Sequence, residues 1–442
     1  MILTGKEPSF RKRQRRSNPY YIILLLIFIM VGFFVMRAFQ SGDIEPYGLP
    51  TPIPTRTANS YKTEGETYFM AGNLDSSMDA YNKALELEPD NATIWAEVAR
   101  IKTYSSANLT VDALRIARLE EALEAATRAV ELAPEDSYAH GIRAFALSWY
   151  ATSVLDEETR SNSLSEAERE AIAALTFDND NTLALVYYAE IQATQSLILQ
   201  AQTNIEMALA REPDLMDAHR VHGFVLESMG YYRDAINAYQ RAVELNPNLT
   251  FIYIRMGVNY RQLQQFETAL EQFAKAARIN EQNGVNDPLP YLAIGRTYTQ
   301  MGEFFIAARN VEKVLDFDPS NPDIYGALGI IYFRGRNYEG AIPALQCATY
   351  GCDAETSCAV RFCNPETEEP VVIPPTPLSS TTVVYYYTYG SVLAGMHMPG
   401  RPYCEEAVKV LADVRERYSQ EPVIMSIVRE SENICRSFGY EQ

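Results

Sequence analysis

Apolar positions along most of the chain follow the 3.6-residue period of helices that bury one face. The stretch from Pro213 to Asn248 contains two such segments, separated by Gly230 and closed by Pro247. Glycine ends a helix easily because it adopts left-handed backbone angles, and proline cannot continue a helix. At i, i+3, i+4 and i+7 spacing, one face of the second segment carries Ala235, Ala238, Tyr239 and Ala242. The stretch therefore predicts two short amphipathic helices joined by a tight turn.

The same design recurs along the chain. Closing residues, at steps of 45, 45, 34, 34, 34 and 38 residues, are Pro89, Pro134, Asn179, Pro213, Pro247, Glu281 and Pro319. Small residues in the first helix of each pair are Gly65, Ala99, Ala144, Ala189, Gly223, Gly257, Gly295, Gly329 and Gly390. Alanines in the second helix are Ala122, Ala167, Ala201, Ala235, Ala269, Ala307, Ala341 and Ala407. One pair cannot bury its apolar face alone, so the pairs are expected to stack.

This pattern resembles the tetratricopeptide repeat (TPR), a 34-residue helix–turn–helix unit with a small residue in its first helix and an alanine in its second. The resemblance implies an all-α fold, a right-handed superhelical solenoid of about nine units, preceded by one transmembrane helix. Eight units are expected within residues 57–355, and a last unit with a capping helix within 383–442. Residues 356–382 form a Cys- and Pro-rich insertion. The second helix of unit two is expected to be lengthened, and residues 155–164 to form a polar loop before a helix capped by Ser163.

The N-terminal region predicts a membrane anchor. Seventeen apolar residues at positions 20–36 follow a basic tail, residues 1–19, that contains RKRQRR at 11–16. Basic residues flanking a membrane helix stay on the cytoplasmic side, so the tail is expected in the cytoplasm and the repeats outside it. The chain is thus expected to be a single-pass protein of the cell membrane. A cleavable signal peptide is the alternative, although no small-x-small cleavage site follows. Residues 37–56 are rich in Pro and Thr and are expected to form an extended spacer.

Charge and motifs limit the function classes. The chain has a net charge of −19, and residues 1–19 contribute six cations and one anion, so the remainder carries −19 − 5 = −24. Such a body would repel phosphate, and no nucleic-acid partner is expected. No nucleophile elbow, phosphate loop or paired catalytic carboxylates is found, so neither an enzyme nor a cofactor is expected.

Six cysteines fall in the last 96 residues, at Cys347, Cys352, Cys358, Cys363, Cys404 and Cys435. In a body outside the cytoplasm they predict up to three disulfides, of fifteen possible pairings. Zinc binding is the alternative, but the first four lack close CxxC pairs. His219 and His222 are three residues apart on a predicted helix, as metal ligands can be. Both occupy positions that the repeat uses for packing between helices, and no metal is expected.

Proteins of this family usually bind extended peptides in a groove lined by the first helices. Transferring the groove positions to this sequence selects Arg220, Phe224, Phe251, Arg261, Arg296, Phe333 and Arg334. Arginines on the inner wall of an acidic body would attract an acidic, extended segment of a partner protein. The alternative is that these arginines pair with neighbouring carboxylates.

Two functions are compatible with these features. The first is a membrane-tethered scaffold that mediates protein–protein interaction on the extracytoplasmic side, in the assembly or stabilisation of an envelope complex. The second is a permanent structural or accessory subunit of a larger membrane assembly.

Overall fold

The computed structural model describes residues 18–41, 56–109, 111–364 and 366–440. It divides into two units, residues 1–56 and 57–442. The basic tail and most of the predicted spacer lie outside the described residues. In the first unit, α1 (Pro19–Ser41) is longer than the predicted 20–36 segment. Among the described helices one, Pro19–Ala38, is long and apolar enough to cross a membrane, which is also true of a signal sequence.

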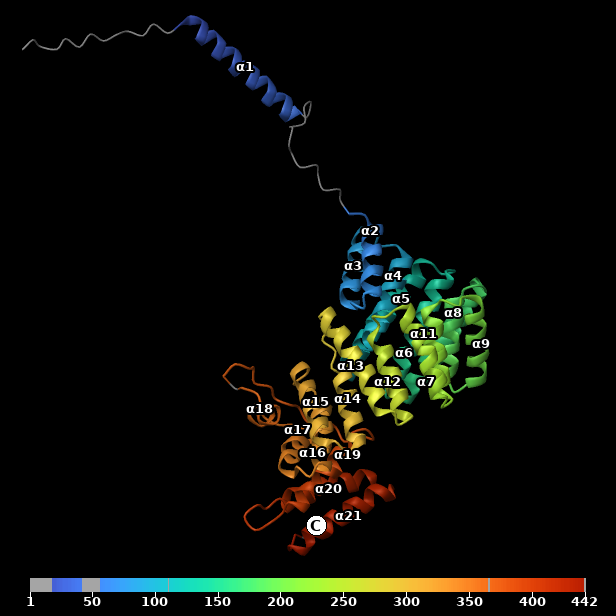
Figure 1. Cartoon of the computed structure of the whole chain (residues 1–442), viewed down its shortest axis with the longest axis vertical. Helices are drawn as coiled ribbons and strands as arrows, with labels where there is room; N and C mark the ends of the chain where they lie inside the picture. The colour runs from blue at the N-terminus through green and yellow to red at the C-terminus, as the bar shows by residue number, and fades with distance from the viewer. Residues whose placement is uncertain (1–17, 42–55, 110, 365, 441–442) are drawn as a thin grey trace, which may run out of the picture. The chain divides into compact units, whose positions relative to one another are not determined.

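The second unit is built from helix pairs, and the described residues contain no strand (Figure 1). The first helices of the nine pairs, here called A helices, are α2 (Ala58–Met70), α4 (Ala92–Ser106), α6 (Ser137–Ser153), α8 (Thr182–Thr194), α10 (Met216–Ser228), α12 (Thr250–Gln262), α14 (Leu289–Met301), α16 (Pro322–Arg334) and α19 (Val383–Gly395). The second, or B, helices are α3 (Leu74–Leu87), α5 (Asp112–Leu132), α7 (Glu157–Phe177), α9 (Ile198–Arg211), α11 (Tyr232–Leu245), α13 (Phe266–Asn283), α15 (Phe304–Phe317), α17 (Tyr338–Thr349) and α20 (Cys404–Tyr418). The helical solenoid of about nine units is confirmed.

Within each pair, a small residue lets the two helices approach closely. An added Cβ at Gly223 on α10 would lie 2.6 Å from the ring of Tyr239 on α11. The same relation joins Gly65 to Tyr81 and Gly257 to Phe273. The aromatic ring therefore occupies the space that a side chain on the A helix would take, which explains the glycine and alanine pattern of the sequence.

Two B helices, α5 and α7, have 21 residues each, against 14 in most of the other B helices. The lengthening of α5 to 21 residues was expected. The polar loop predicted at 155–164 is wrong, because α7 begins at Glu157 and is capped by Asp156, which accepts from the Thr159 amide. Ser163 is not a cap. It begins a buried stripe with Ala167, Ala171 and Ala174, at the i, i+4 spacing that turns one helix face toward its neighbours.

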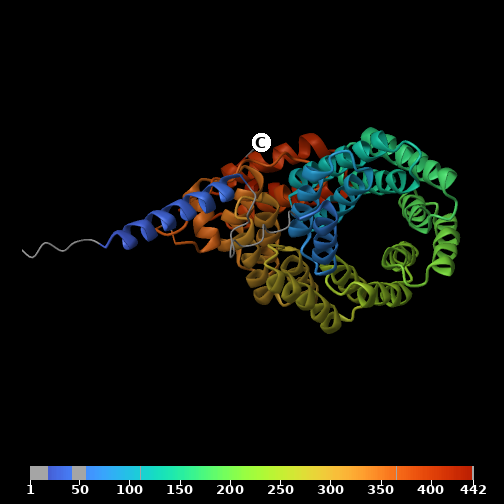
Figure 2. The same ribbon diagram turned by 90° about the horizontal axis from the view of Figure 1, so that it is seen from above.

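The first six units curve until their two ends meet (Figure 2). The turn after α2 contacts the turn before α12, because Asn248 Nδ2 donates to the Met70 carbonyl at 2.9 Å. Asn283 Nδ2, at the end of α13, donates to the Ala71 carbonyl at 2.8 Å. Gly72, at a φ of +77°, lies directly against the Asn248 backbone. The solenoid is thus closed into a ring by hydrogen bonds between unit one and unit six.

The remaining units extend beyond this ring. Between α17 and α19 lie α18 (Ala354–Arg361) and a segment tied back by an antiparallel bridge between Cys352 and Ile373. The final helix, α21 (Pro422–Ser437), covers the last pair. The cysteines pair as Cys347–Cys352, Cys358–Cys363 and Cys404–Cys435, with Cα atoms 4.7, 4.9 and 5.4 Å apart. These separations are those of disulfides.

Candidate partner-binding site

Aromatic side chains from several A helices meet on the inner side of the ring. Tyr104 on α4 is fully buried, and its ring centroid lies 5.9 Å from Phe69, 5.1 Å from Phe145 and 5.8 Å from Trp149. It also stacks on Phe251 of α12, at 5.6 Å. Units far apart in the sequence therefore share one aromatic cluster, which fills part of the space that an open TPR groove would leave to a ligand.

Buried ion pairs accompany this cluster. Arg220 donates from Nη1 and Nη2 to the two carboxylate oxygens of Glu190, at 2.7 and 2.8 Å. The carboxylate of Asp217 accepts a hydrogen bond from Arg100 Nη2 at 2.6 Å and another from the hydroxyl of Tyr104. Burial alone would raise the pKa of Asp217, but Arg100 and Arg220 outweigh it and lower that pKa. Asp217 is therefore favoured in its ionised form inside the protein, with Arg100 and Arg220 as its opposite charges.

This arrangement corrects the expectation for Arg220. The residue is 4% exposed, and its guanidinium pairs with Glu190 and with Asp217, so it is not a free cation. The alternative, pairing with neighbouring carboxylates, holds at this position. Its partner Glu190 was missed. Glu190 directly follows the small residue Ala189, and Phe224 directly follows the small residue Gly223 one repeat later. The two residues therefore share one position of the repeat, and that position predicts an inward-facing side chain at Glu190 too.

Two of the predicted phenylalanines line one cavity of about 440 Å³. Phe224 and Phe251 form it together with Trp149 and Leu289, and the Arg220–Glu190 pair also lines it. A cavity of this size, largely apolar with a few charged groups, is typical of a site for a ligand or an inserted side chain. Arg255, which the sequence analysis did not select, stacks over Phe224 at 5.6 Å and pairs with Glu227 at 3.2 Å.

A second cavity of about 590 Å³ is more polar. It is lined by Arg100 and Asp217, whereas the first is lined by Arg220 and Glu190. Because Arg220 Nε also contacts Asp217 at 3.4 Å, the linked ion pairs stand between the two cavities.

Arg261 on α12 and Arg296 on α14 are near enough for their charges to interact. Burial and then the charge of Arg296 lower the pKa of Arg261. Within the described part of the chain, Nη1 of Arg261 is buried without a hydrogen-bond partner, and neither arginine is in an ion pair. Arg296 is exposed and Arg261 is half-buried. Two adjacent cations without a carboxylate create a local preference for an anion.

The last two predicted residues lie elsewhere. Phe333 packs into the C-terminal core and lies 6.0 Å from the ring of Tyr338. Arg334 is exposed at the end of α16. Neither residue lines the cavity that Phe224 and Phe251 share. The seven predicted residues are thus distributed over three places along the solenoid.

The histidines have structural contacts. His219 Nε2 lies 2.7 Å from the Pro213 carbonyl. His222 has its pKa lowered by burial and by His219. In the described residues, no group of three or more His, Cys, Asp or Glu side chains is arranged to hold a metal ion.

Stacked antiparallel helix pairs with a small residue at each crossing define a helical-repeat protein of the solenoid class. Models of the tetratricopeptide repeat match residues 58–91, 221–249, 252–283 and 292–353. The chain is a member of the TPR family.

Two relatives illustrate its similarity to known proteins. The chain is 27% identical over 158 residues to the BBSome complex member BBS4 of Bos taurus, covering 34% of this chain and 30% of the relative. It is 23% identical over 111 residues to anaphase-promoting complex subunit 3 of Schizosaccharomyces pombe, covering 25% of this chain and 16% of the relative. The matches thus span less than a third of the length of either relative. Among solved structures, the yeast Tom70 is similar with a TM-score of 0.40 at 13% identity, covering 86% of this chain and 94% of that chain.

Proposed function

We propose that the protein is a membrane-tethered TPR scaffold that holds a protein partner outside the cytoplasm and helps to assemble or stabilise an envelope complex. TPR proteins mediate protein–protein interaction, and the two relatives are a member and a subunit of multiprotein complexes by name. The apolar helix α1 supports a tether, and the six basic residues before position 20 support a cytoplasmic N-terminus. No catalytic role is proposed.

The observation that carries the partner site is the Arg261–Arg296 pair. The charges of the two arginines repel, and burial makes the unpaired donor of Arg261 unfavourable until an anion accepts from it. An acidic, extended segment would supply carboxylates to these two side chains. The cavity lined by Phe224 and Phe251 would take an apolar side chain of the same segment. Arg220 contributes by holding the cavity wall in place through Glu190.

Charge reversal tests this site. The double variant Arg261→Glu/Arg296→Glu should lose partner binding at least tenfold in a crosslinking pull-down quantified by mass spectrometry. Binding by the unchanged protein should weaken with salt without vanishing, because apolar contact remains. Arg278→Glu, an exposed arginine on the B helix α13, is the matched control and should bind normally. Equal binding by all three proteins would place recognition on another surface.

Orientation is tested separately. Protease added to intact cells or spheroplasts should digest the repeats while the membrane is still sealed. Protection of a C-terminal tag until the membrane is permeabilised would contradict the proposed orientation.

The second candidate function is a permanent subunit of a larger assembly. It is favoured by the names of the relatives, which describe a complex member and a complex subunit. Size-exclusion chromatography of a gentle detergent extract separates the two. A monomer that exchanges partners supports the scaffold, and a fixed large assembly supports the subunit.

A further inference from the structure

The insertion after α17 presents an aromatic side chain in an unusual conformation. Phe362 directly follows α18, with a φ of 55° and a ψ of 33°. Among the described residues, three other non-glycine residues have positive φ, namely Ser196, Gln264 and Arg336. Those three lie in the turns between A and B helices, where other units use glycine. Phe362 lies outside any such turn, so the repeat does not explain it.

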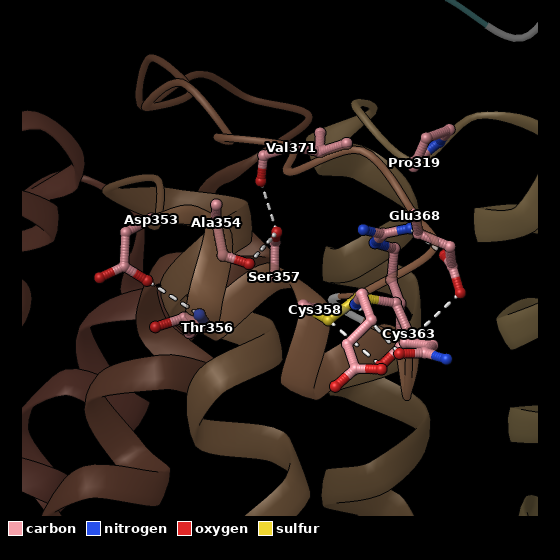
Figure 3. Close-up of a disulfide and its surroundings, with 12 residues drawn as sticks. Pro319, Asp353, Ala354, Thr356, Ser357, Cys358, Cys363, Glu368 and Val371 are labelled. Atoms are coloured by element: carbon pink, nitrogen blue, oxygen red, sulfur yellow. Dashed lines mark hydrogen bonds and ion pairs between the residues drawn. A yellow bond between two sulfur atoms is a disulfide. The ribbon is translucent and has the colours of Figure 1, made fainter.

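Local bonding holds Phe362 in this conformation. Cys358 and Cys363 pair on either side of it, and the Cys363 amide donates to the Cys358 carbonyl at 3.0 Å (Figure 3). Arg361 is 7% exposed and pairs with Glu368 at 3.3 Å. Glycine is the usual residue at such a helix end, and a bulky residue there is strained. The strain is not offset by packing, because Phe362 is 76% exposed.

The surroundings of Phe362 form a hollow surface with apolar and basic groups. Phe362 and Arg361 line a cavity of about 490 Å³ with Ile306, Arg309 and Lys313 of α15. Phe305, also 76% exposed, lies one turn before Arg309 on the same helix. We call these residues the α15–α18 patch. The patch lies on a B helix and on the insertion, away from the A helices that form the candidate site.

Charge indicates what fits this patch. Its exposed cations are Arg309 and Lys313, since the side chain of Arg361 is buried against Glu368, and its lining also includes Glu312 and Asp316. Glu312 accepts from the Tyr332 hydroxyl at 2.7 Å and so belongs to the helix packing. In a chain with a net charge of −19, a cavity where cations outnumber anions favours an acidic ligand. A flat bilayer surface cannot fill a hollow of this size, whereas a protein segment can place a side chain in it.

We propose that the α15–α18 patch is a second protein-docking surface, and that it binds an acidic segment of another protein with Phe362 and Phe305 as apolar anchors. Exposed aromatic side chains next to a pocket are typical of residues that dominate binding energy. The disulfide-closed turn fixes the direction of Phe362 before binding, which reduces the entropy lost on association.

Site-specific photo-crosslinking in cells that make the full chain tests the proposal. Benzoylphenylalanine at position 362 or 305 should crosslink to another protein, through a peptide rich in Asp and Glu as mapped by mass spectrometry. The same probe at Phe438, half exposed beyond α21, is the matched control and should not capture that peptide. Arg309→Glu/Lys313→Glu should reduce the yield from position 362 at least fivefold.

Four outcomes would overturn the proposal. The probe at position 362 could give no crosslink, or the probe at position 438 could capture the same peptide equally well. The crosslinking yield from position 362 could be unchanged by the charge reversal, or the crosslinks could form only with lipid or with a second copy of this chain. A stability measurement excludes a merely structural role. Phe362→Gly should keep the melting temperature of the full chain or raise it, because glycine adopts this conformation without strain. The same variant should lose the captured complex, detected by crosslinking from position 305. A lower melting temperature with the complex retained would make Phe362 a packing residue.

Discussion

Arg220 and Glu190 form a two-pronged ion pair between α10 and α8, with donor–acceptor distances of 2.7 and 2.8 Å, and both side chains are almost completely buried. Removing one partner leaves an uncompensated charge inside the ring. Glu190→Gln should therefore destabilise the protein by about 3–5 kcal/mol. Chemical denaturation followed by circular dichroism measures this loss.

Two controls separate charge burial from a general effect of substitution. Arg220→Met/Glu190→Gln should be less destabilised than Glu190→Gln alone, since no unpaired arginine remains. The introduced amide oxygen can still accept from Trp149 Nε1, which lies 3.1 Å from Glu190 Oε1 in the native protein. Glu405→Gln breaks an exposed pair with Lys409 on α20 and should leave stability nearly unchanged. Similar losses in Glu190→Gln and Glu405→Gln would contradict the buried network.

Closure of the ring predicts different effects for two glycines with similar backbone angles. Gly72 has a φ of +77° and Gly230 a φ of +79°, so alanine is strained at both, by about 1–2 kcal/mol. Only at Gly72 would the added Cβ collide with the Asn248 backbone, whereas Gly230 has open space. Gly72→Ala should therefore accelerate hydrogen exchange in residues 246–249, and Gly230→Ala should not. The same exchange rate there in both variants would show that the ring is open in solution.

The helix pairs were predictable because their signal is local. A period of 34 residues, with glycine or alanine at each crossing, determines pairing between neighbours in sequence. The error at 155–164 arose because that segment is polar, yet its helix is determined by a buried stripe that begins at Ser163. Closure of the ring at Asn248 depends on the superhelical pitch summed over six units. No local sequence pattern predicts that sum. Likewise, the sequence indicated that Arg220 faces inward but not that Glu190 lies opposite it.

The cysteine pairs predict unequal contributions to stability. Cys404 and Cys435 join α20 to α21 across 31 residues, whereas Cys358 and Cys363 close only five. In the chain-entropy account these loops contribute about 4 and about 2 kcal/mol. Replacing Cys404 and Cys435 by alanine should therefore destabilise the last unit more than replacing Cys358 and Cys363. Local hydrogen exchange compares the two variants. Both pairings would be contradicted if mass mapping without reductant found six free thiols.

The connection before α14 contains a carboxylate whose protonation should affect local stability. Asp287 is 2% exposed and accepts from Asn280 Nδ2 at 2.8 Å and from the Leu289 amide, at the start of α14, at 2.9 Å. Burial is the main cause that raises the pKa of Asp287 to about 6, above its ordinary value of 3.8, while the two hydrogen bonds oppose the rise. The folded protein therefore holds this proton more tightly than the unfolded chain does.

The sign of the pH effect follows from this difference. The contribution of Asp287 to stability is fully present below pH 4 and is lost as the pH rises through about 6. A shift of roughly two pKa units corresponds to about 3 kcal/mol. Protection of the α13 and α14 amides from hydrogen exchange should fall over this range in the unchanged protein. Asp287→Asn should flatten that dependence, because an amide oxygen can still accept from the Leu289 amide but does not titrate. An equally steep fall in the variant would assign the pH dependence to other groups.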